Sequence, residues 1–360
     1  MSKLDELIAE LCPDGVEYKP LGNVCKIETG KLNANAAVED GEYLFFTTAK
    51  EPSRIDQYRW DTEALLIAGN ANVGNVKYYV GKFDAYQRTY VLTDFEPSVS
   101  VKFLYYSLSN NLKEYLDSRK NEAAMVYIVL STLQDFRIPV PPIEIQREIV
   151  RILDNFTELT AELTAELTAR RKQYEYYRDL LLTFGDDISW CNLEEILKIR
   201  NGKDYKSFNV GNIPVYGSGG IMTYIDTYAY DKPSVLIPRK GSIDKLYYVE
   251  KPFWTVDTIF YTEIYTSKVI PKYVFYCLQK ERLEQYNTAG GVPSLTQTVL
   301  NKVKIPVPPL EEQERIVAIL DRFDALCNDL TSGIPAEIEA RQKQYEYYRD
   351  KLLSFKEVTA

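Results

Sequence analysis

Histidine is absent from the 360-residue sequence, and its absence excludes the catalytic groups that depend on an imidazole. Histidine is the side chain that most often acts as general acid or base near neutral pH, and it completes Ser-His-Asp triads. It is also a frequent zinc ligand. The sequence therefore argues against a self-sufficient enzyme and offers few metal ligands.

Cysteine is scarce and widely spaced, with no CxxC pair. The five residues are Cys12, Cys25, Cys191, Cys277 and Cys327. An odd number without close pairs argues against both a disulfide framework and a zinc site. We expect reduced cysteines in the core.

Long apolar runs are also missing. No segment approaches the roughly 18 to 20 apolar residues of a membrane span, and the opening MSKLDELIAELC is an acidic amphipathic helix pattern without the apolar region of a signal peptide. The 45% hydrophobic and 26% charged fractions are typical of a soluble globular protein. We expect a cytoplasmic protein without a membrane partner.

The net charge of −9 argues, for the chain as a whole, against a polyanionic partner. The charge is unevenly distributed, because residues 198–304 hold 15 Lys and Arg against 9 Asp and Glu, whereas residues 26–137 hold 13 against 15. Residues 198–304, where Lys and Arg are in excess, are therefore a candidate surface for nucleic acid.

One long segment occurs twice. Residues 138–156 and 305–323 are identical at 13 of 19 positions, and the blocks RRKQYEYYRDLLLTF and RQKQYEYYRDKLLSF that end at Phe184 and Phe355 are identical at 12 of 15. In each copy a Pro-Pro pair stands just ahead of the periodic region, which suits a helix start. A repeat of this length predicts two related structural units.

Heptad spacing predicts that each copy is one long helix. One series comprises Ile149, Phe156, Leu163 and Tyr177, and the companion series comprises Leu153, Leu167, Tyr174 and Leu181. A helix from about residue 144 to 183 needs a partner along this seam, and the second copy provides one. Gly333 and Pro335 should break or kink the second helix.

Short aromatic and β-branched runs precede each long helix. The runs that begin at residues 42, 64 and 89 have counterparts that begin at residues 212, 234 and 258. The segments that open the two globular units, residues 20–31 and 192–203, show the alternation of a β-strand. Residues 101–116 and 271–286 are amphipathic helix patterns. The fold class is α+β: two similar units of mainly antiparallel strands, each followed by a long helix.

The short linker GDDISW at 185–190 places the second unit at the end of the first helix. The two long helices should then form an antiparallel coiled coil with pseudo-two-fold symmetry. The predicted domains are a first globular unit with an N-terminal helix, a central helix, a second globular unit and a C-terminal helix, at 1–142, 143–184, 185–309 and 310–360.

These features together resemble the specificity subunit of a type I restriction-modification system. The resemblance rests on the opening LDELIAELCPDGVEYKPLG, two variable units, two PVPP entries, two KQYEYYRD blocks and a tandem TAEL repeat at 160–167. It implies that each variable unit is a target recognition domain for half of a bipartite double-stranded DNA site. The helices would then set the spacer.

The resemblance also implies partners. Two modification subunits would bind S-adenosylmethionine and methylate adenine, and restriction subunits would supply ATP- and magnesium-dependent translocation and cleavage. The chain itself would be non-catalytic and hold no cofactor. Consistent with this, the sequence lacks DPPY, NPPF and Walker A motifs.

Candidate DNA-binding residues lie in turns after apolar strands, where cations reach phosphate or guanine and asparagine pairs with adenine. In the first unit they are Thr48, Lys50, Arg54, Asn70, Asn72, Asn75 and Arg88; in the second they are Tyr216, Ser218, Arg239, Lys240, Ser242 and Lys245. The alternative is ordinary solvated turn chemistry. Because the first loop lacks a cation, we expect two different half-sites.

Candidate partner-binding residues lie near the ends of the long helices, at Tyr176, Arg178, Tyr347 and Arg349. Tyr176 and Tyr347 fall off the heptad seam, whereas closure of the coiled coil explains Tyr174 and Tyr177. A coiled-coil assembly adaptor whose globular units bind protein is the alternative function.

Overall fold

The computed structural model describes residues 3–119, 127–185, 187–287, 290–329 and 332–358, so residue 186 of the predicted linker lies outside the described ranges. The chain divides into two compact units. Unit 1 comprises Met1–Glu162 with Ile338–Ala360, and unit 2 comprises Leu163–Glu337. The boundaries fall inside two long helices, so each unit contains part of both.

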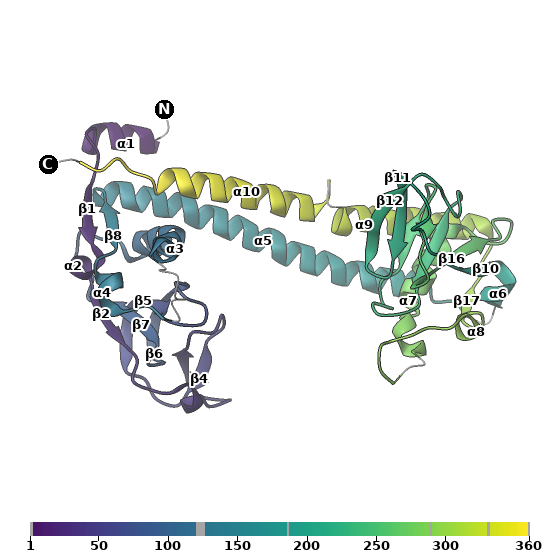
Figure 1. Cartoon of the computed structure of the whole chain (residues 1–360), viewed down its shortest axis with the longest axis horizontal. Coiled ribbons are helices and arrows are strands. Elements are labelled where there is room, and N and C mark those ends of the chain that lie inside the picture. The colour runs from purple at the N-terminus through teal and green to yellow at the C-terminus, as the bar shows by residue number, and fades with distance from the viewer. Residues whose placement is uncertain (1–2, 120–126, 186, 288–289, 330–331, 359–360) are drawn as a thin grey trace. The chain divides into compact units, whose positions relative to one another are not determined.

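The first half of the chain supplies most of unit 1 (Figure 1). Its elements are α1 (Lys3–Leu11), β1 (Glu17–Pro20), α2 (Leu21–Val24), β2 (Lys26–Thr29), η1 (Ala34–Ala36), β3 (Tyr43–Phe46), β4 (Ser53–Ile55), β5 (Trp60–Ala68), β6 (Val76–Ala85), β7 (Thr89–Thr93), α3 (Val101–Ser118), α4 (Leu130–Gln134), β8 (Arg137–Val140) and α5 (Ile143–Leu181).

A six-stranded sheet in the order β2-β7-β5-β6-β3-β4 forms the frame of unit 1. Its strand pairs are antiparallel except β3 with β6. β5 is covered on both faces: Leu65 and Ile67 join the cluster that includes α3, while Ala64 and Leu66 join a second cluster. This two-residue alternation explains why the run is apolar at every position.

The second half of the chain supplies most of unit 2, although its last part, from Ile338 onward, belongs to unit 1. Its elements are β9 (Trp190–Asn192), α6 (Leu193–Ile196), β10 (Leu197–Asn201), β11 (Val210–Gly217), β12 (Gly220–Ile225), β13 (Ser234–Pro238), β14 (Tyr247–Val249), β15 (Trp254–Thr255), β16 (Ile259–Ile264), α7 (Pro271–Lys280), η2 (Leu283–Tyr286), α8 (Gln297–Leu300), β17 (Lys304–Pro306), α9 (Leu310–Asn328) and α10 (Ile334–Leu352).

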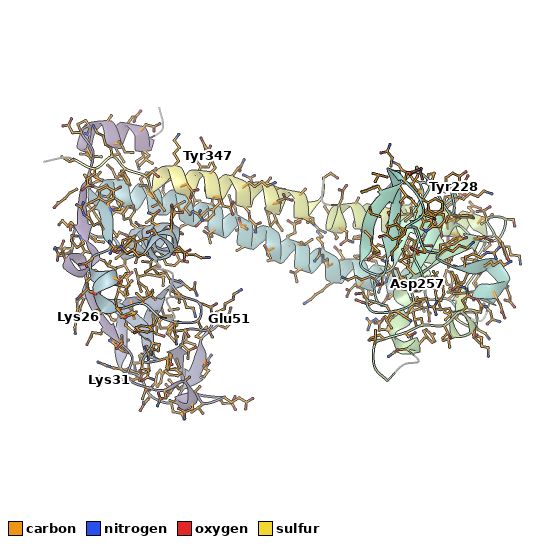
Figure 2. The ribbon with its side chains drawn as sticks, in the orientation of Figure 1. Lys26, Lys31, Glu51, Tyr228, Asp257 and Tyr347 are labelled. Atoms are coloured by element: carbon orange, nitrogen blue, oxygen red, sulfur yellow. The ribbon has the colours of Figure 1, made fainter. Side chains whose placement is uncertain are left out.

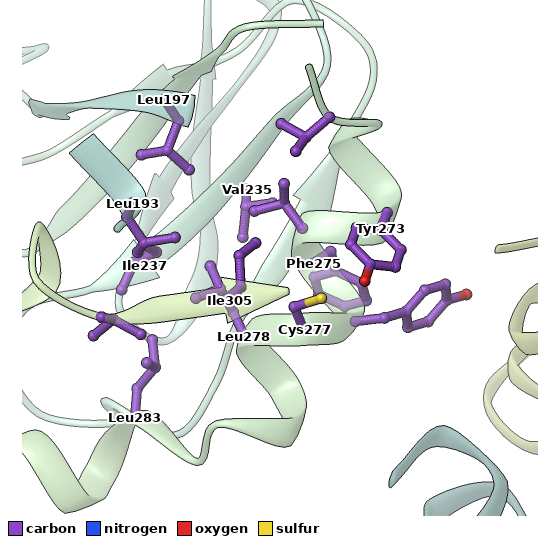
Figure 3. Close-up of a cluster of buried hydrophobic side chains, with 14 of the residues drawn as sticks. Leu193, Leu197, Val235, Ile237, Tyr273, Phe275, Cys277, Leu278, Leu283 and Ile305 are labelled. Atoms are coloured by element: carbon purple, nitrogen blue, oxygen red, sulfur yellow. The ribbon is translucent and has the colours of Figure 1, made fainter. Parts of the chain in front are cut away.

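Among the described residues, two larger sheets carry most strands of unit 2, in the orders β10-β16-β13-β14 and β12-β11-β15, and β17 pairs with β9 in a third. The first is antiparallel throughout, whereas β11 and β15 pair in parallel. The main core lies between the first sheet and α7, where Val235 and Ile237 share one cluster with Tyr273 and Cys277 (Figure 3). The α+β class with mainly antiparallel strands is therefore confirmed.

The long helices pack antiparallel within each unit. In unit 1, Phe156 of α5 contacts Tyr348 of α10, and Ile149, two turns earlier in α5, shares a cluster with Leu353 just beyond α10. In unit 2, Tyr177 of α5 contacts Phe323 of α9. The helix pairing predicted from the heptads, and its antiparallel direction predicted from the short linker, are thus present in both units.

The predicted break in the second helix is also confirmed, since α9 ends at Asn328 and α10 begins at Ile334. A Cβ added at Gly333 would lie 2.6 Å from the carbonyl oxygen of Ala325, so only glycine fits there. The prediction that the segments opening the two globular units, residues 20–31 and 192–203, have strand-like alternation was wrong near their beginnings. The segments 21–24 and 193–196 are short helical turns, α2 and α6, and the strands begin after them.

Buried glutamines join the globular parts to the long helices. In unit 1, Gln146 of α5 accepts a hydrogen bond from the Ser100 N–H at 2.8 Å and donates to the carbonyls of Ser98 and Pro141 at 2.8 and 2.7 Å. In unit 2, Gln313 of α9 makes the corresponding three bonds. The same anchor therefore fixes each globular part to a helix.

All five cysteines are free thiols, and all except the half-buried Cys191 are buried, as the sequence predicts. Burial raises the pKa of the Cys25 and Cys277 thiols to about 12. These two side chains therefore remain protonated and pack as small apolar groups.

Candidate nucleic-acid interface

Two loops share part of their backbone conformation in the two units: residues 69–75 follow β5, and residues 239–245 follow β13. The third residue of each is left-handed, with φ of 54° at Ala71 and 81° at Gly241. The N–H two positions later donates to the carbonyl of this residue, at 2.9 Å in unit 1 and 2.8 Å in unit 2. The two segments therefore correspond in their backbone hydrogen bonds, although Gly74, the sixth residue in unit 1, is also left-handed with φ of 80° and the sixth residue in unit 2 is not.

Flanking segments hold the unit 1 loop. The Gly69 N–H donates to the Arg88 carbonyl at 2.8 Å, and the Gly69 carbonyl accepts from the Ile128 N–H at 2.8 Å. The Arg88 guanidinium lies over the ring of Tyr127, 5.5 Å from its centroid. Asn70 forms an isolated bridge with Tyr127, and its Oδ1 is buried without a hydrogen-bond partner within the described ranges.

The same three segments meet in unit 2. The Arg239 N–H donates to the Thr258 carbonyl at 2.9 Å, and the Arg239 carbonyl accepts from the Leu295 N–H at 2.9 Å. The Arg239 guanidinium lies over Phe260, 5.3 Å from the ring centroid. Its Nε is buried and has no hydrogen-bond partner in the part of the chain that the structure describes.

Other predicted residues of unit 1 gather beside its loop. The Asn72 side chain donates to the Thr48 carbonyl at 2.7 Å. Lys50, Asn72 and Asn75 line one open cavity of about 890 Å³ between the loop and α3. Lys77 Nζ donates to the Ala49 carbonyl at 2.6 Å, and burial lowers the pKa of this amine.

Ser218 and Tyr216 lie beside the unit 2 loop. The Tyr247 hydroxyl donates to the Ser218 carbonyl at 3.2 Å, and the ring centroids of Tyr216 and Tyr247 are 6.0 Å apart. A Cβ added at Gly241 would lie 3.7 Å from Ser218 Oγ, so the two segments are adjacent. Burial raises the pKa of both tyrosines, which keeps the hydroxyls protonated as donors.

The remaining cations of this loop are exposed. Lys240 pairs with Ser294 through a backbone bridge, and Lys245 closes a turn by donating its N–H to the Ser242 carbonyl at 3.2 Å. The side chains of Lys240 and Lys245 extend into solvent. Unit 2 therefore presents three cations on a loop that carries none in unit 1.

Arg54 lies apart from this group. It belongs to β4, the edge strand of the sheet, and its Nη1 donates to the carbonyls of Gly41 and Glu42 at 3.5 and 3.3 Å. Its role in DNA binding stays a prediction, as do the roles of the other candidates.

Sequence reasoning did not identify several residues of the interface, namely Lys77, Tyr127, Tyr247, Thr258 and Ser294. Tyr127 and Ser294 follow from no local motif, because they come from segments far along the chain. Thr258 could have been predicted from the sequence, since it directly precedes β16, the strand of unit 2 that corresponds to β7.

The tyrosine pairs near the helix ends have the same geometry in both units. The ring centroids are 5.4 Å apart in the pair Tyr176 and Tyr177, and 5.3 Å apart in the pair Tyr347 and Tyr348. Tyr176 and Tyr347 are 65% and 64% exposed, and Figure 2 shows Tyr347 projecting from α10. In each pair the first ring is thus the more exposed of the two.

The arginines that follow these tyrosines form ion pairs with neighbouring carboxylates. Arg178 is buried and binds Asp179 at 2.8 Å, whereas Arg349 is half-buried and binds Asp350 at 2.8 Å. Their role in partner binding remains a prediction.

Within the described residues, no cluster of three or more His, Cys, Asp or Glu side chains is arranged to hold a metal ion. None of the helices in that part of the chain is both long and apolar enough to span a membrane.

A family model described as the type I restriction modification DNA specificity domain matches residues 13–170 and again residues 186–340. A putative type I restriction enzyme specificity subunit of Haemophilus influenzae is 33% identical over 94% of this chain and 96% of its own length. The specificity subunit of the type I restriction enzyme EcoR124I/EcoR124II of Escherichia coli is 35% identical over 71% of each chain.

Among solved structures, the S subunit of a type I restriction-modification system from M. genitalium has the same fold, with a TM-score of 0.63 and 19% identity over 94% of this chain and 96% of that one. The family model matches the chain twice, just as the structure contains the equivalent loop twice and the helix pair twice. This chain belongs to the family of type I restriction-modification DNA specificity subunits.

Proposed function

We propose that this chain is the non-catalytic subunit that recognises a bipartite double-stranded DNA site, with each unit contacting one half-site. The observation that carries the proposal is the loop that repeats with corresponding backbone hydrogen bonds and different side chains, at 69–75 and 239–245. A repeated backbone suits a repeated ligand such as duplex DNA. Different side chains suit different bases.

The chemistry of the two loops supports nucleic acid over protein. The unit 2 loop presents Arg239, Lys240 and Lys245, and the unit 1 loop presents amide side chains beside Lys50 and Arg88. Phosphates attract the cations, while amides and guanidinium groups match base edges. A protein-binding adaptor has no need for donors gathered at one corresponding place in both units.

The exposed tyrosines Tyr176 and Tyr347 support docking of two modification subunits, because the same aromatic patch occurs once in each unit. In this proposal S-adenosylmethionine belongs to the modification subunits, and ATP and magnesium belong to restriction subunits. The chain holds no cofactor of its own. Its residues position partners and DNA.

Mapping of adenine methylation in cells that express the chain with its modification subunit tests the proposal. We expect a motif of two defined half-sites separated by undefined base pairs. A single continuous motif would contradict two-unit recognition.

Salt dependence separates DNA recognition from the adaptor function. The logarithm of duplex affinity should fall linearly with the logarithm of salt concentration, because phosphate contacts release counterions. Duplex binding that does not change with salt, or no duplex binding, would favour the adaptor.

A further inference from the structure

The two units each present one arginine on an aromatic ring at the same place in the frame. In both, the first residue after a strand donates its N–H to the last residue before a neighbouring strand, from Gly69 to Arg88 and from Arg239 to Thr258. In unit 1 the arginine, Arg88, is the residue whose carbonyl accepts this bond. In unit 2 the arginine, Arg239, is the residue whose N–H donates it. The residues on the two sides of this bond thus supply the same chemical group, one in each unit.

Local packing explains the exchange. A Cβ added at Gly69 would lie 2.6 Å from the Arg88 carbonyl oxygen and 3.1 Å from the Tyr90 ring, so unit 1 has no room for a side chain where unit 2 has Arg239. The guanidinium is instead supplied from across the bond, by Arg88. The two arginines therefore flank the same backbone hydrogen bond but lie on rings from different segments, Tyr127 in unit 1 and Phe260 in unit 2.

Both guanidinium groups lie over a ring and lack an acceptor among the described residues. Arg88 lies 5.5 Å from the centroid of Tyr127, and Arg239 lies 5.3 Å from that of the buried Phe260. Neither makes a hydrogen bond or ion pair through its guanidinium with any described residue. By contrast, Arg54 donates to two carbonyls of its own unit. A planar fork fixed on a ring loses little freedom when it binds.

The geometry points to Arg88 and Arg239 as the residues that recognise guanine, one in each half-site. An arginine fork pairs with guanine O6 and N7 in the major groove, whereas the flexible lysines of the same loop suit phosphates, which carry no sequence information. This inference rests on the proposed function, because it assigns the base at a site that must first bind DNA.

The main test uses Arg88→Met and Arg239→Met in the full chain, in complex with its modification subunit, on a randomised duplex library. Methionine keeps an apolar stem on the ring and removes the fork. We expect each variant to lose preference at one G·C pair of its own half-site, by roughly 5- to 150-fold, while the other half-site is retained. Each variant is thus the control for the other.

Two matched controls separate base recognition from charge and from packing. Arg119 also lies over a tyrosine, 4.5 Å from the centroid of Tyr115, but at the end of α3. Arg119→Met should leave the motif unchanged. Lys245→Ala should weaken binding to all sequences alike and reduce the salt slope by about 1.

A third measurement needs no folding-sensitive variant. The unaltered complex is tested on duplexes in which 7-deazaguanine replaces one guanine at a time, which removes the N7 acceptor. We expect a roughly 2- to 12-fold loss of affinity at one guanine in each half-site. The affinity of the Arg239→Met variant should not change when the same guanine of the second half-site is replaced, because this variant already lacks the guanidinium donor.

The outcomes are distinguishable. A motif that is bipartite but insensitive to both variants and to 7-deazaguanine, or that lacks a G·C pair in either half-site, overturns the inference and leaves the proposed function standing. A complex that selects no sequence overturns both.

Discussion

The ring of Phe156 stacks on the ring of Tyr348, with centroids 5.6 Å apart and planes at 25°. Phe323 and Tyr177 repeat this contact in unit 2 at 5.6 Å and 26°. In each unit the phenylalanine belongs to the opening block of one repeat and the tyrosine to the closing block of the other. Each unit is therefore completed by both copies of the repeat.

Replacing the phenylalanines should destabilise the units separately. Because each ring is half-buried, Phe156→Ala or Phe323→Ala should lower the free energy of unfolding by about 1 to 3 kcal/mol. Hydrogen exchange should show lost protection in unit 1 for the first variant and in unit 2 for the second. Glu158→Ala, an exposed change on α5, is the control; equal loss in both units for either variant would contradict separate packing.

The buried amides of Gln146 and Gln313 should matter more than their lack of charge suggests. Gln146→Met leaves one N–H and two carbonyls of unit 1 without their partner, so we expect a loss of about 3 kcal/mol in chemical denaturation. Gln313→Met should cost a similar amount in unit 2. A loss below about 1 kcal/mol in both would show that water replaces the amide.

The repeat and the spacing of apolar residues were sufficient to predict the helices, but not the register of the strands. The shared letters Tyr-Tyr-Val align Tyr78 with Tyr247. The strand pairs instead place Lys77 opposite Leu66 and Tyr247 opposite Leu236, so Lys77 and Tyr247 are equivalent. A one-residue shift of this kind is fixed by backbone pairing across the sheet, which local sequence does not encode.

The candidate site was predicted only where it is local. The loops at 69–75 and 239–245 were found because each follows an apolar strand, whereas Tyr127 reaches Arg88 only through tertiary packing. The short helical turns α2 and α6 were mistaken for strand, since four residues are too few to show a helical period.

The left-handed residue of the repeated loop predicts opposite effects of two substitutions. Ala71 has φ of 54°, a conformation that glycine adopts without penalty, so Ala71→Gly should stabilise unit 1 by up to about 1 kcal/mol. Gly241→Ala introduces the same penalty in unit 2 and should destabilise it by about 1 kcal/mol. Thermal denaturation of the two variants checks the pair; the same sign for both would contradict the shared conformation.

The carboxylate of Glu148 predicts loss of stability in acid. Its side chain is 5% exposed and pairs with Arg151 at 2.7 Å and Lys3 at 3.3 Å, and these bonds lower its pKa to about 2. Because the folded pKa lies below the unfolded value of about 4.3, the contribution is present above pH 4.3 and is lost as pH falls through 2. Both cations are exposed, so we expect only about 1 kcal/mol.

Denaturation of Glu148→Gln and of the unaltered chain between pH 2 and pH 7 measures this contribution. The stability difference should be present at pH 7 and shrink toward pH 2. A difference that is the same at every pH would mean that packing, and not charge, is responsible.

The tandem TAEL segment predicts a change in the DNA spacer. Between Leu153 and Tyr174, α5 is described throughout and has no buried side chain, so an insertion there disturbs no core. One added TAEL lengthens a helix by about 6 Å, which corresponds to roughly one or two base pairs at 3.4 Å each. Methylation mapping should return unchanged half-sites with a longer spacer. Replacing one TAEL with AAEL keeps the length and should keep the spacer; an unchanged spacer after the insertion would show that the helices do not set it.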